Sequence, residues 1–478
     1  MLFNSIQFGI FLPIVFALYW IIPHKYRWAL LFAASYYFYM SWNAKYVFLI
    51  FGTTFVSYLA ALRLEKASSD KEKKVILAIT AIVCLGVLFF FKYFNFFFES
   101  VSQIFSLFAI KLNPITLNVL LPVGISFYTF QTLSYVIDVY HGKVKAEHHF
   151  GYYAAFISFF PQLVAGPIER TSNLLPQIKS EKKFDYEQAT YGMKLMAWGF
   201  FKKLAIADVF GFIVDGIFNY HYLYTGGVFI LASLLFGIQI YCDFSGYSDI
   251  AIGCAKLMGI NLMTNFKSPY FSTTVGEFWR RWHISLSTWF RDYVYIPLGG
   301  NRCSKPRRYF NLFVTFVVSG LWHGANVTFI LWGALHGVLQ IIENFFAKFF
   351  KRESKGIVWW IRVIWMYLLV CFAWMFFRAN SFSEIVWIFM ATPDGISHPL
   401  TYLSTVIQNV DLKPIDGIIK LITLIVLFAY DYASLKVDVI EYISKKKRIV
   451  RYLAYTFVLA LILWQRFDGV ASFVYFQF

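Results

Sequence analysis

The sequence predicts an all-α membrane protein whose helices cross the bilayer many times. Of its 478 residues, 59% are hydrophobic and only 14% are charged, whereas soluble domains average roughly 45–50% and about 25%. The mean hydropathy is +0.59. If this chain were soluble, disordered or fibrous, its polar groups would be too few to cover its apolar surface. The composition therefore excludes these classes. We find no internal repeat or low-complexity tract, so we expect residues 1–478 to form a single membrane domain.

The excess of positive charge indicates the topology of the chain. A formal net charge of +17 could suggest a nucleic-acid partner, but the Lys and Arg residues gather in short loops between apolar runs, at 63–74, 302–308, 348–355 and 445–451. Such basic loops are typical of the cytoplasmic side. We therefore expect membrane lipid, and no nucleic acid, around these charges. A dedicated site for an anionic ligand at one of the clusters stays open as an alternative.

The five cysteines indicate neither a disulfide framework nor a metal site. They form no C-x-x-C pair, and no histidine lies at metal-ligand spacing from them. We expect no bound metal and no resident cofactor.

The first apolar segments alternate across the membrane. The segment before residue 24 lacks a basic start and an A-x-A cleavage site, so we expect a retained span with residue 1 outside and residues 24–27 in the cytoplasm. Three spans are predicted next, at 28–43, 46–62 and 75–91. This alternation places the basic loop 63–74 in the cytoplasm, as the charge rule requires.

Proline and glycine interrupt the apolar segments in the middle of the chain. Residues 121–140 carry Pro122 and Gly124, and residues 150–170 are broken in the same way. Because a broken backbone survives in a membrane only where protein or a water-filled cavity satisfies it, we expect re-entrant or cavity-lining pieces here. Further spans are predicted at 188–206, 226–245, 310–346 in two pieces, 357–377, 416–432 and 452–466. Residues 379–415 are predicted to form a mostly polar, extracytoplasmic excursion.

Residues 309–342 are predicted to enter the membrane and return as a hairpin. These 34 residues contain no Asp, Glu, Lys or Arg. One helix of this length would measure about 51 Å, far more than a hydrocarbon core of roughly 30 Å. Basic clusters on both sides place both ends in the cytoplasm. The glycines of the segment GLWHGAN, residues 320–326, are where the helix would break most easily.

This hairpin would place His323 near the extracytoplasmic side, within reach of the cytoplasm. A histidine inside a membrane segment is a functional candidate, because satisfying its ring nitrogens there has a cost. Asn326 lies one turn further on and is predicted to orient the ring. The alternative is a structural histidine that bonds to a neighbouring helix, and we favour that alternative for His336, which has no comparable break beside it.

A second histidine, His283, lies in the segment 276–293. At 100° per residue, the tryptophans of this segment share one arc, and its arginines and small polar residues fill the opposite arc. The pattern predicts one amphipathic helix in the membrane interface, with tryptophan at headgroup level and His283 at the edge of the apolar arc. A plain interfacial helix explains the tryptophans and arginines without a use for the histidine.

Several segments together resemble the membrane-bound O-acyltransferase family, and within it the branch of alginate O-acetyltransferases and related polysaccharide acetylation proteins. The resemblance covers nearly the whole chain. It is carried by PVGISFYTFQTLSYVIDVYHG (122–142), FPQLVAGPIER (160–170), YCDFSGYSDIAIG (241–253), EFWRRWHISLSTWFRDYVYIPLGGNR (277–302), SGLWHGANVTFILWGALHG (319–337) and the tail VYFQF.

The resemblance implies that His323, in WHG, is the catalytic histidine and that His283, in RWHISLS, is the family's second histidine. It also implies about eleven spans, with re-entrant and interfacial helices, around a funnel whose tunnel joins a cytoplasmic donor entrance to an outer acceptor chamber. Trp322 and Asp243 are further candidates for lining or orienting the site. Cys242 precedes Asp243 where relatives often have an aromatic residue.

Acyl transfer from a thioester to an alcohol suits these residues. A neutral imidazole can act as the general base near pH 7, which contributes ~10²–10⁴-fold. We find no G-x-S-x-G motif and no Cys–His pair on adjacent turns, so a covalent acyl-enzyme is disfavoured. Arg280, Arg281, Arg291 and the loop 302–308 are predicted to attract the phosphates of acetyl-CoA, the expected acyl donor. Anchoring of the helix on the lipid surface would explain the same charges.

We therefore predict an enzyme of the plasma or inner membrane that moves an acetyl group from cytoplasmic acetyl-CoA outward. The acetyl group would reach an extracytoplasmic polysaccharide directly or through a partner transferase. Two alternatives stay open. One is D-alanyl transfer to teichoic acid from a carrier protein, and the other is a solute transporter with broken helices, although transporters usually show an internal symmetry that we do not find.

Overall fold

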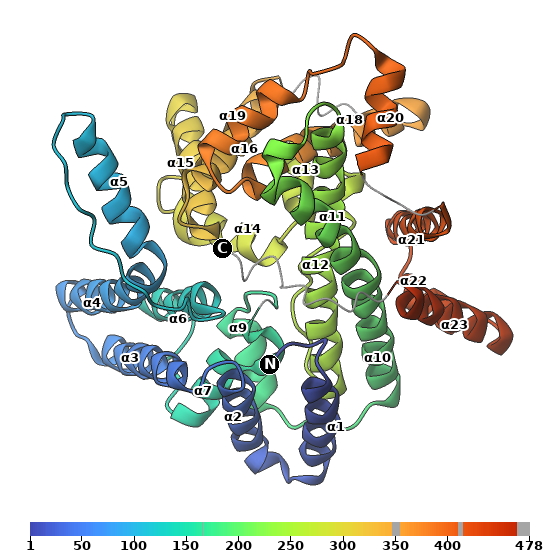
Figure 1. Ribbon diagram of the computed structural model, residues 1–478. Coiled ribbons are helices and arrows are strands. Elements are labelled where there is room, and N and C mark those ends of the chain that lie inside the picture. Colours follow the sequence, from blue (N-terminus) through green and yellow to red (C-terminus); the bar gives the residue numbers. More distant parts are fainter. Residues whose placement is uncertain (165, 347–353, 410–413, 466–478) are drawn as a thin grey trace. The chain divides into compact units, whose positions relative to one another are not determined.

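The computed structural model describes residues 1–164, 166–346, 354–409 and 414–465 (Figure 1). These residues form helices joined by loops, and no strand occurs among them. The all-α fold predicted from composition is therefore confirmed. Its contacts divide the chain into two compact units, of which the first comprises 1–196 and 250–263 and the second 197–249 and 264–478. The single membrane domain expected over 1–478 stays a prediction.

The first unit is built around the buried helix α6, Ile125–Tyr140, in which every side chain from Ile125 to Val136 is buried. It packs against α3 and α4, and α7 packs against α2 and α3 (Figure 1). The other helices of this unit are α1 (Ile6–Ile21), α2 (His24–Met40), α3 (Val47–Lys66), α4 (Asp70–Leu88), α5 (Phe94–Ser106), α7 (Phe150–Ser158), α8 (Phe160–Leu163), α9 (Thr171–Lys179) and most of α10 (Tyr186–Phe200).

The two segments predicted to be broken are broken. Helix α6 begins only after Gly124, whose φ of 73° lies in the left-handed region that favours glycine. Between α7 and α8 the backbone turns at Phe159, and the amide of Phe160 donates to Oγ of Ser35 at 3.0 Å. Protein groups thus satisfy the interrupted backbone, as the sequence predicts for broken segments at membrane depth.

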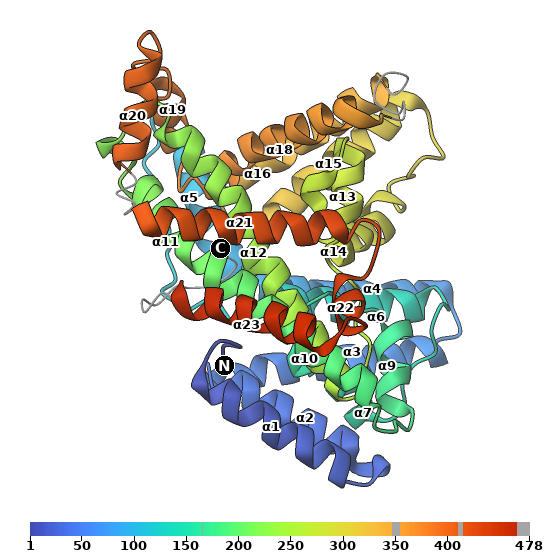
Figure 2. The same cartoon turned by 90° about the vertical axis from the view of Figure 1, so that its right-hand side faces the viewer.

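The second unit contains the remaining helices. They are α11 (Asp208–Asn219), α12 (Val228–Leu257, whose last turns belong to the first unit), α13 (Val275–Arg281), α14 (Ile284–Phe290), α15 (Lys305–His323), α16 (Val327–Phe345), α18 (Gly356–Arg378), α19 (Phe382–Ala391), α20 (Pro399–Asn409), α21 (Pro414–Ala433), α22 (Val439–Ser444) and α23 (Arg448–Trp464). Helices α21 and α23 lie alongside each other in both views (Figure 1, Figure 2), and Gln465 bonds to Thr423 between them.

The centre of the second unit is aromatic. The tryptophans Trp282, Trp332 and Trp374 are all fully buried. The Trp332 and Trp374 rings stack with 5.6 Å between centroids, and Trp282 lies 5.0 Å from Trp374. Aromatic pairs of this kind add to the area that they bury. This cluster surrounds the candidate site described below.

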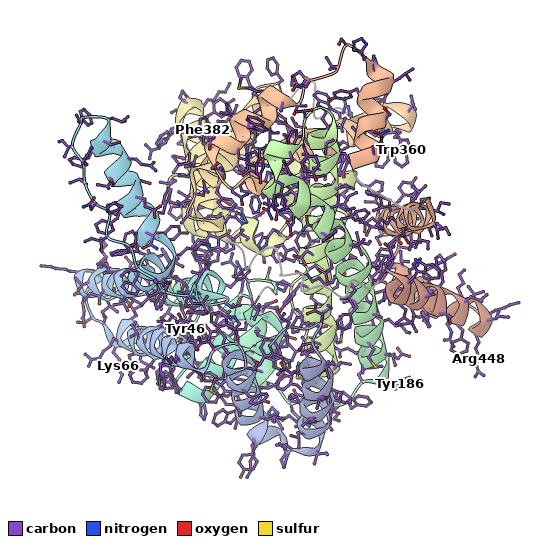
Figure 3. All side chains as sticks on the ribbon, in the orientation of Figure 1. Tyr46, Lys66, Tyr186, Trp360, Phe382 and Arg448 are labelled. Carbon is purple, nitrogen blue, oxygen red and sulfur yellow. The ribbon has the colours of Figure 1, made fainter. Side chains whose placement is uncertain are left out.

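The outer faces of the helices carry apolar side chains. Figure 3 labels two of them, Trp360 on α18 and Phe382 at the start of α19, and both are exposed. Five described segments are long and apolar enough to cross a membrane, at 44–66, 70–106, 228–257, 327–345 and 356–378. Exposed apolar side chains on such helices fit contact with lipid. The larger number of about eleven spans stays a prediction.

The prediction for the segment 379–415 is wrong. The segment 379–415 was expected to be a mostly polar excursion, but it contains the helices α19 and α20. Ser381 caps α19 by accepting a hydrogen bond from the amide of Glu384, and Ile388 is buried in the aromatic core of the second unit. The apolar run FSEIVWIFMA is therefore part of the packed structure, because one face of it covers the core. The extracytoplasmic position of the segment 379–415 stays a prediction.

Candidate active site

Helices α15 and α16 form the predicted hairpin. Helix α15 ends at His323 and α16 begins at Val327, so the break falls at the glycine-containing turn. Two glycines allow the antiparallel helices to approach closely: a Cβ at Gly320 would overlap the carbonyl oxygen of Phe329, and one at Gly333 would overlap that of Phe316. The sequence prediction of a turn beside His323 is confirmed.

His323 lies in a cage of aromatic rings. Its side chain is buried, and three rings surround the imidazole edge-on. The ring centroid lies 4.9 Å from that of Trp322, 5.1 Å from that of Trp332 and 5.1 Å from that of Phe377. The cage holds the imidazole between the hairpin and α18.

Asn326 does not orient this ring, which corrects the prediction made from its spacing. Its Oδ1 accepts a hydrogen bond from the amide of Thr328 at 3.0 Å, and its Nδ2 donates to the carbonyl oxygen of Asn380 at 2.8 Å. Both polar atoms of the side chain are thus engaged in capping α16 and in fastening the turn to the chain after α18. Asn326 therefore shapes the turn.

His283 lies at a break between two short helices, α13 and α14. The prediction of one continuous interfacial helix over 276–293 is therefore wrong. Trp282 has an extended backbone, and His283 has a φ of 42°, in the left-handed region. The His283 side chain and the tryptophans Trp282 and Trp289 are buried. Packing inside the second unit accounts for these buried tryptophans, and the interfacial position of the segment stays a prediction.

The structure brings the two predicted histidines close to one tryptophan. The Trp322 ring lies 6.2 Å from that of His283 and 4.9 Å from that of His323, edge-on to both. His336, which the sequence did not favour as a functional residue, is fully buried next to this cluster. Its ring lies 5.0 Å from Trp332 and 5.1 Å from Trp279.

A cavity of about 440 Å³ adjoins this cluster, and its lining residues include neither His283 nor His323. Of its lining residues, Arg291 and Asn301 are exposed, while Phe290 and Ser319 are buried. Ser319 is one turn before His323 on α15, and the Phe290 ring lies 6.5 Å from that of Trp322. The full lining is Trp279, Leu286, Ser287, Phe290, Arg291, Tyr295, Asn301, Arg308, Leu312, Thr315, Phe316, Ser319, Gln340 and Asn344.

Comparison with known proteins identifies the family. The model of the membrane-bound O-acyltransferase family, MBOAT, matches residues 145–383. The probable alginate O-acetylase AlgI of Pseudomonas aeruginosa is 41% identical over 391 residues, which cover 81% of this chain and 74% of the relative. The chain belongs to the membrane-bound O-acyltransferase family.

Two further relatives are named for acyl acceptors other than alginate. The peptidoglycan O-acetyltransferase of Helicobacter pylori is 36% identical over 425 residues, covering 80% of this chain and 78% of the relative. The teichoic acid D-alanyltransferase of Streptococcus thermophilus is 32% identical over 279 residues, covering 54% and 66%. The chain is thus an O-acyltransferase, and the transporter considered from the sequence is not retained.

The three arginines predicted to bind the donor differ in their position relative to the cavity. Arg291 lines the cavity and also pairs with its neighbour Asp292 at 2.8 Å. Arg281 pairs with Glu277 at 2.8 Å, one turn earlier on α13, and is not among the lining residues. Arg280 is exposed and is not among the lining residues. Arg308, from the predicted basic loop, joins Arg291 in the lining. Periodicity alone could not separate these arginines, because it assumed one straight helix.

Asp243 belongs to a buried ionic cluster on α12 and the π-helical turn 201–207. Nζ of Lys203 lies 2.6 Å from Oδ1 of Asp243 and 2.7 Å from Oδ1 of Asp208. Lys202 pairs with Asp249 at 2.5 Å in the same unit. Sequence analysis missed these lysines, although two adjacent charges within the predicted span 188–206 were a signal, since ionisable groups inside a membrane are costly and need partners.

Proposed function

We propose that this acyltransferase takes an acetyl group from acetyl-CoA at the cytoplasmic side and delivers it for O-acetylation of an extracytoplasmic polysaccharide. The observation that carries the proposal is the position of His323: it lies in an aromatic cage one helical turn from Ser319, and Ser319 lines a cavity that also has Arg291 and Arg308 in its lining. The names of the relatives that cover most of the chain support acetyl as the transferred group.

In the proposed step, the oxygen of the acceptor hydroxyl attacks the thioester carbon of acetyl-CoA. The His323 imidazole takes the hydroxyl proton as the new C–O bond forms. The C–S bond then breaks, and the thiolate of coenzyme A receives that proton. A positioned general base of this kind contributes ~10²–10⁴-fold to the rate. The products are the acetyl ester and the free thiol, and His323 is again neutral.

The cavity is the proposed entrance of the donor. Arg291 and Arg308 would contact its phosphates, since the guanidinium group presents paired donors to phosphate oxygens. The depth of the cavity is lined by apolar and small hydroxyl side chains, Leu286, Phe290 and Ser319. Such a lining suits the thin pantetheine arm and its acetyl thioester, so the reacting carbon would lie near the His323 cage.

D-alanyl transfer to teichoic acid from a carrier protein is the second candidate of the same chemistry. The similarity to the D-alanyltransferase covers 54% of this chain, against 81% for the alginate O-acetylase. A cavity of about 440 Å³ with arginines in its lining also suits a small phosphorylated donor better than the surface of a carrier protein. We therefore favour the acetyl donor.

The topology and the partners are further parts of the proposal. The basic loops 63–74, 302–308 and 445–451 would lie in the cytoplasm and residue 1 outside, in the plasma or inner membrane. Arg308 is the last residue of one of these loops, which agrees with donor entry from the cytoplasm. The acetyl group would pass to the glycan itself or to an extracytoplasmic partner transferase.

The test uses the purified protein in lipid nanodiscs with radiolabelled acetyl-CoA and a panel of polysaccharide fragments. We expect label in an alkali-labile ester of one fragment, and none with a His323→Gln variant. A D-alanyl-loaded carrier protein serves as the competing donor. Transfer from the carrier but not from acetyl-CoA would overturn the acetyl proposal and leave the acyltransferase assignment intact.

A further inference from the structure

The loop residue Asn265 bonds to the residues at the break beside His283 through its side chain and through its backbone carbonyl. Its side chain is fully buried, and its Oδ1 is shared by three donors. Nδ1 of His283 lies 3.1 Å from this oxygen, Oγ of Ser285 2.9 Å and the amide nitrogen of Ser285 3.3 Å. The carbonyl oxygen of Asn265 also accepts from the amide of Ile284 at 2.9 Å. One residue thus fixes the backbone and the ring together.

These contacts decide which way the Asn265 amide faces. A backbone amide can only donate, so the atom that faces Ser285 must be the oxygen of the Asn265 side chain. Nδ2 lies on the other side and donates to Oγ of Ser248 at 3.3 Å. The donor that selects the oxygen has only one possible role, so the orientation of the amide is fixed.

The orientation of Asn265 in turn decides where the His283 proton lies. An amide oxygen only accepts, so Nδ1 of His283 must be the donor of their hydrogen bond. A neutral imidazole carries one N–H and one lone pair, and the bond made by one nitrogen sets the state of the other. The proton is on Nδ1, and Nε2 carries the lone pair.

The backbone at His283 indicates that this arrangement is specific. A residue other than glycine is unfavourable in the left-handed region, yet His283 has a φ of 42° and a ψ of 55°. Such outliers persist where surrounding contacts determine them, and they concentrate at functional sites. The Phe244 ring, 4.6 Å away and edge-on, and the Trp322 ring hold the other sides of the imidazole.

From this geometry we propose that Asn265 is a positioning residue, which fixes His283 with its proton on Nδ1 so that Nε2 accepts a hydrogen bond from a bound substrate. The substrate group is an N–H or O–H donor, either an amide of the pantetheine arm of acetyl-CoA or a hydroxyl of the acceptor glycan. The proposal rests on the acetyl transfer proposed above and adds a role for the second histidine of the site. No bond to His283 is made or broken in this role.

The first test determines the tautomer without any enzymatic turnover. The protein has nine histidines, and comparison of ¹⁵N-histidine spectra of the wild type and a His283→Gln variant identifies the signal of His283. We expect the directly bonded proton on Nδ1 in the wild type. In Asn265→Leu, which removes the acceptor, we expect that signal to move or to split between the two nitrogens. A wild-type proton on Nε2 would overturn the inference.

The second test compares variants that remove the Asn265 amide, keep only its acceptor, or remove only the partner of its nitrogen. Asn265→Leu should lower kcat/KM for acetyl transfer roughly 10–100-fold, the usual effect of losing a partner that orients a functional histidine. Asn265→Asp keeps an acceptor for all three donors and should recover most of the activity. Ser248→Ala removes only the partner of Nδ2 and should behave like the wild type in activity and in the tautomer spectrum.

The kinetic readout separates positioning from a structural role. A rise in KM for acetyl-CoA identifies the pantetheine amide as the donor to Nε2, and a rise in KM for the glycan fragment identifies its hydroxyl. If Asn265→Leu changes neither constant, or if Ser248→Ala costs as much as Asn265→Leu, the residue only supports the fold and the proposal fails. If the wild type transfers no acetyl group, the proposed function fails, while the spectra still decide the tautomer.

Discussion

The indole of Trp322 lies edge-on against the imidazole of His323, with 4.9 Å between their ring centroids. The same indole lies 6.2 Å from the His283 ring. Trp322 therefore contacts both histidines. In the proposed reaction the two histidines have different roles: His323 takes the proton of the acceptor hydroxyl, and Nε2 of His283 accepts a hydrogen bond from a bound substrate.

Replacement of His323 should remove the general base. His323→Gln keeps a polar side chain in the aromatic cage but cannot accept the hydroxyl proton, so acetyl transfer should fall at least ~10²-fold. Transfer of radiolabel from acetyl-CoA measures the rate, and the amount of protein in the membrane measures expression. We expect expression to be unchanged, because glutamine is neutral.

His336→Gln is the matched control, because this histidine is equally buried and lies beside the same Trp332. It should retain far more activity than His323→Gln. Near-normal transfer by His323→Gln would make His323 a structural residue, and the base would then have to be His283 or His336.

The hairpin could be predicted from the local sequence, whereas the break at His283 could not. An uncharged run of 34 residues is too long for one crossing, and its glycines mark the turn, so local information was enough to predict α15 and α16. The segment 276–293 contains one glycine, at its start, and no proline. Its break is imposed by Asn265, which is 18 residues away from His283 in the chain. Periodicity within one segment does not contain that contact.

The same reasoning applies to the ionic cluster. Asp243 was a candidate from its motif, but its partner Lys203 is 40 residues away. Only the packing of α12 against the turn 201–207 brings the two charges together, and pairing across such a distance is a tertiary property. The aromatic cage of His323 likewise includes Phe377, from a helix that begins after the hairpin ends.

Close approach of α15 and α16 should make Gly320 intolerant of any side chain. A Cβ at this position overlaps the carbonyl oxygen of Phe329, which is backbone and cannot rotate away. Gly320→Ala should therefore destabilise the protein by about 1–3 kcal/mol, the usual cost of overpacking. The midpoint of thermal unfolding in detergent measures the change.

Gly86→Ala in α4 is the control for the hairpin test, because nothing lies within 4 Å of a Cβ there. Its expected effect is neutral or slightly stabilising, since alanine is the better helix former. Equal midpoints for Gly320→Ala and the wild type would contradict the close packing of the hairpin.

The buried ionic cluster makes Lys203 a strong determinant of stability. Lys203→Met would leave the carboxylates of Asp208 and Asp243 without their shared ammonium partner. Breaking a buried pair in this way costs about 3–5 kcal/mol. Thermal unfolding again gives the measurement. The triple variant Lys203→Met, Asp208→Asn and Asp243→Asn removes all three charges and should recover much of the lost stability, whereas no recovery would show that the charges themselves are not the cause.

The cavity lining predicts which arginines bind the donor. Arg291 and Arg308 line the cavity, whereas Arg280 and Arg281 are not among its lining residues. Arg291→Ala and Arg308→Ala should each raise KM for acetyl-CoA with little change in kcat, because a phosphate contact is made equally in the ground state and the transition state. The double variant should raise KM further, and high salt should reduce the difference from the wild type.

Arg280→Ala is the matched control for the donor site, since it removes the same charge from the same segment of the chain. Its KM for acetyl-CoA should stay close to that of the wild type. This outcome would reject the sequence-based prediction that all three arginines of the segment bind the donor. Equal increases in KM for Arg280→Ala and Arg291→Ala would instead mean that the basic surface as a whole attracts the phosphates, and the cavity would no longer explain donor binding. The two results differ in a measured constant, so the position of each arginine relative to the cavity is directly testable.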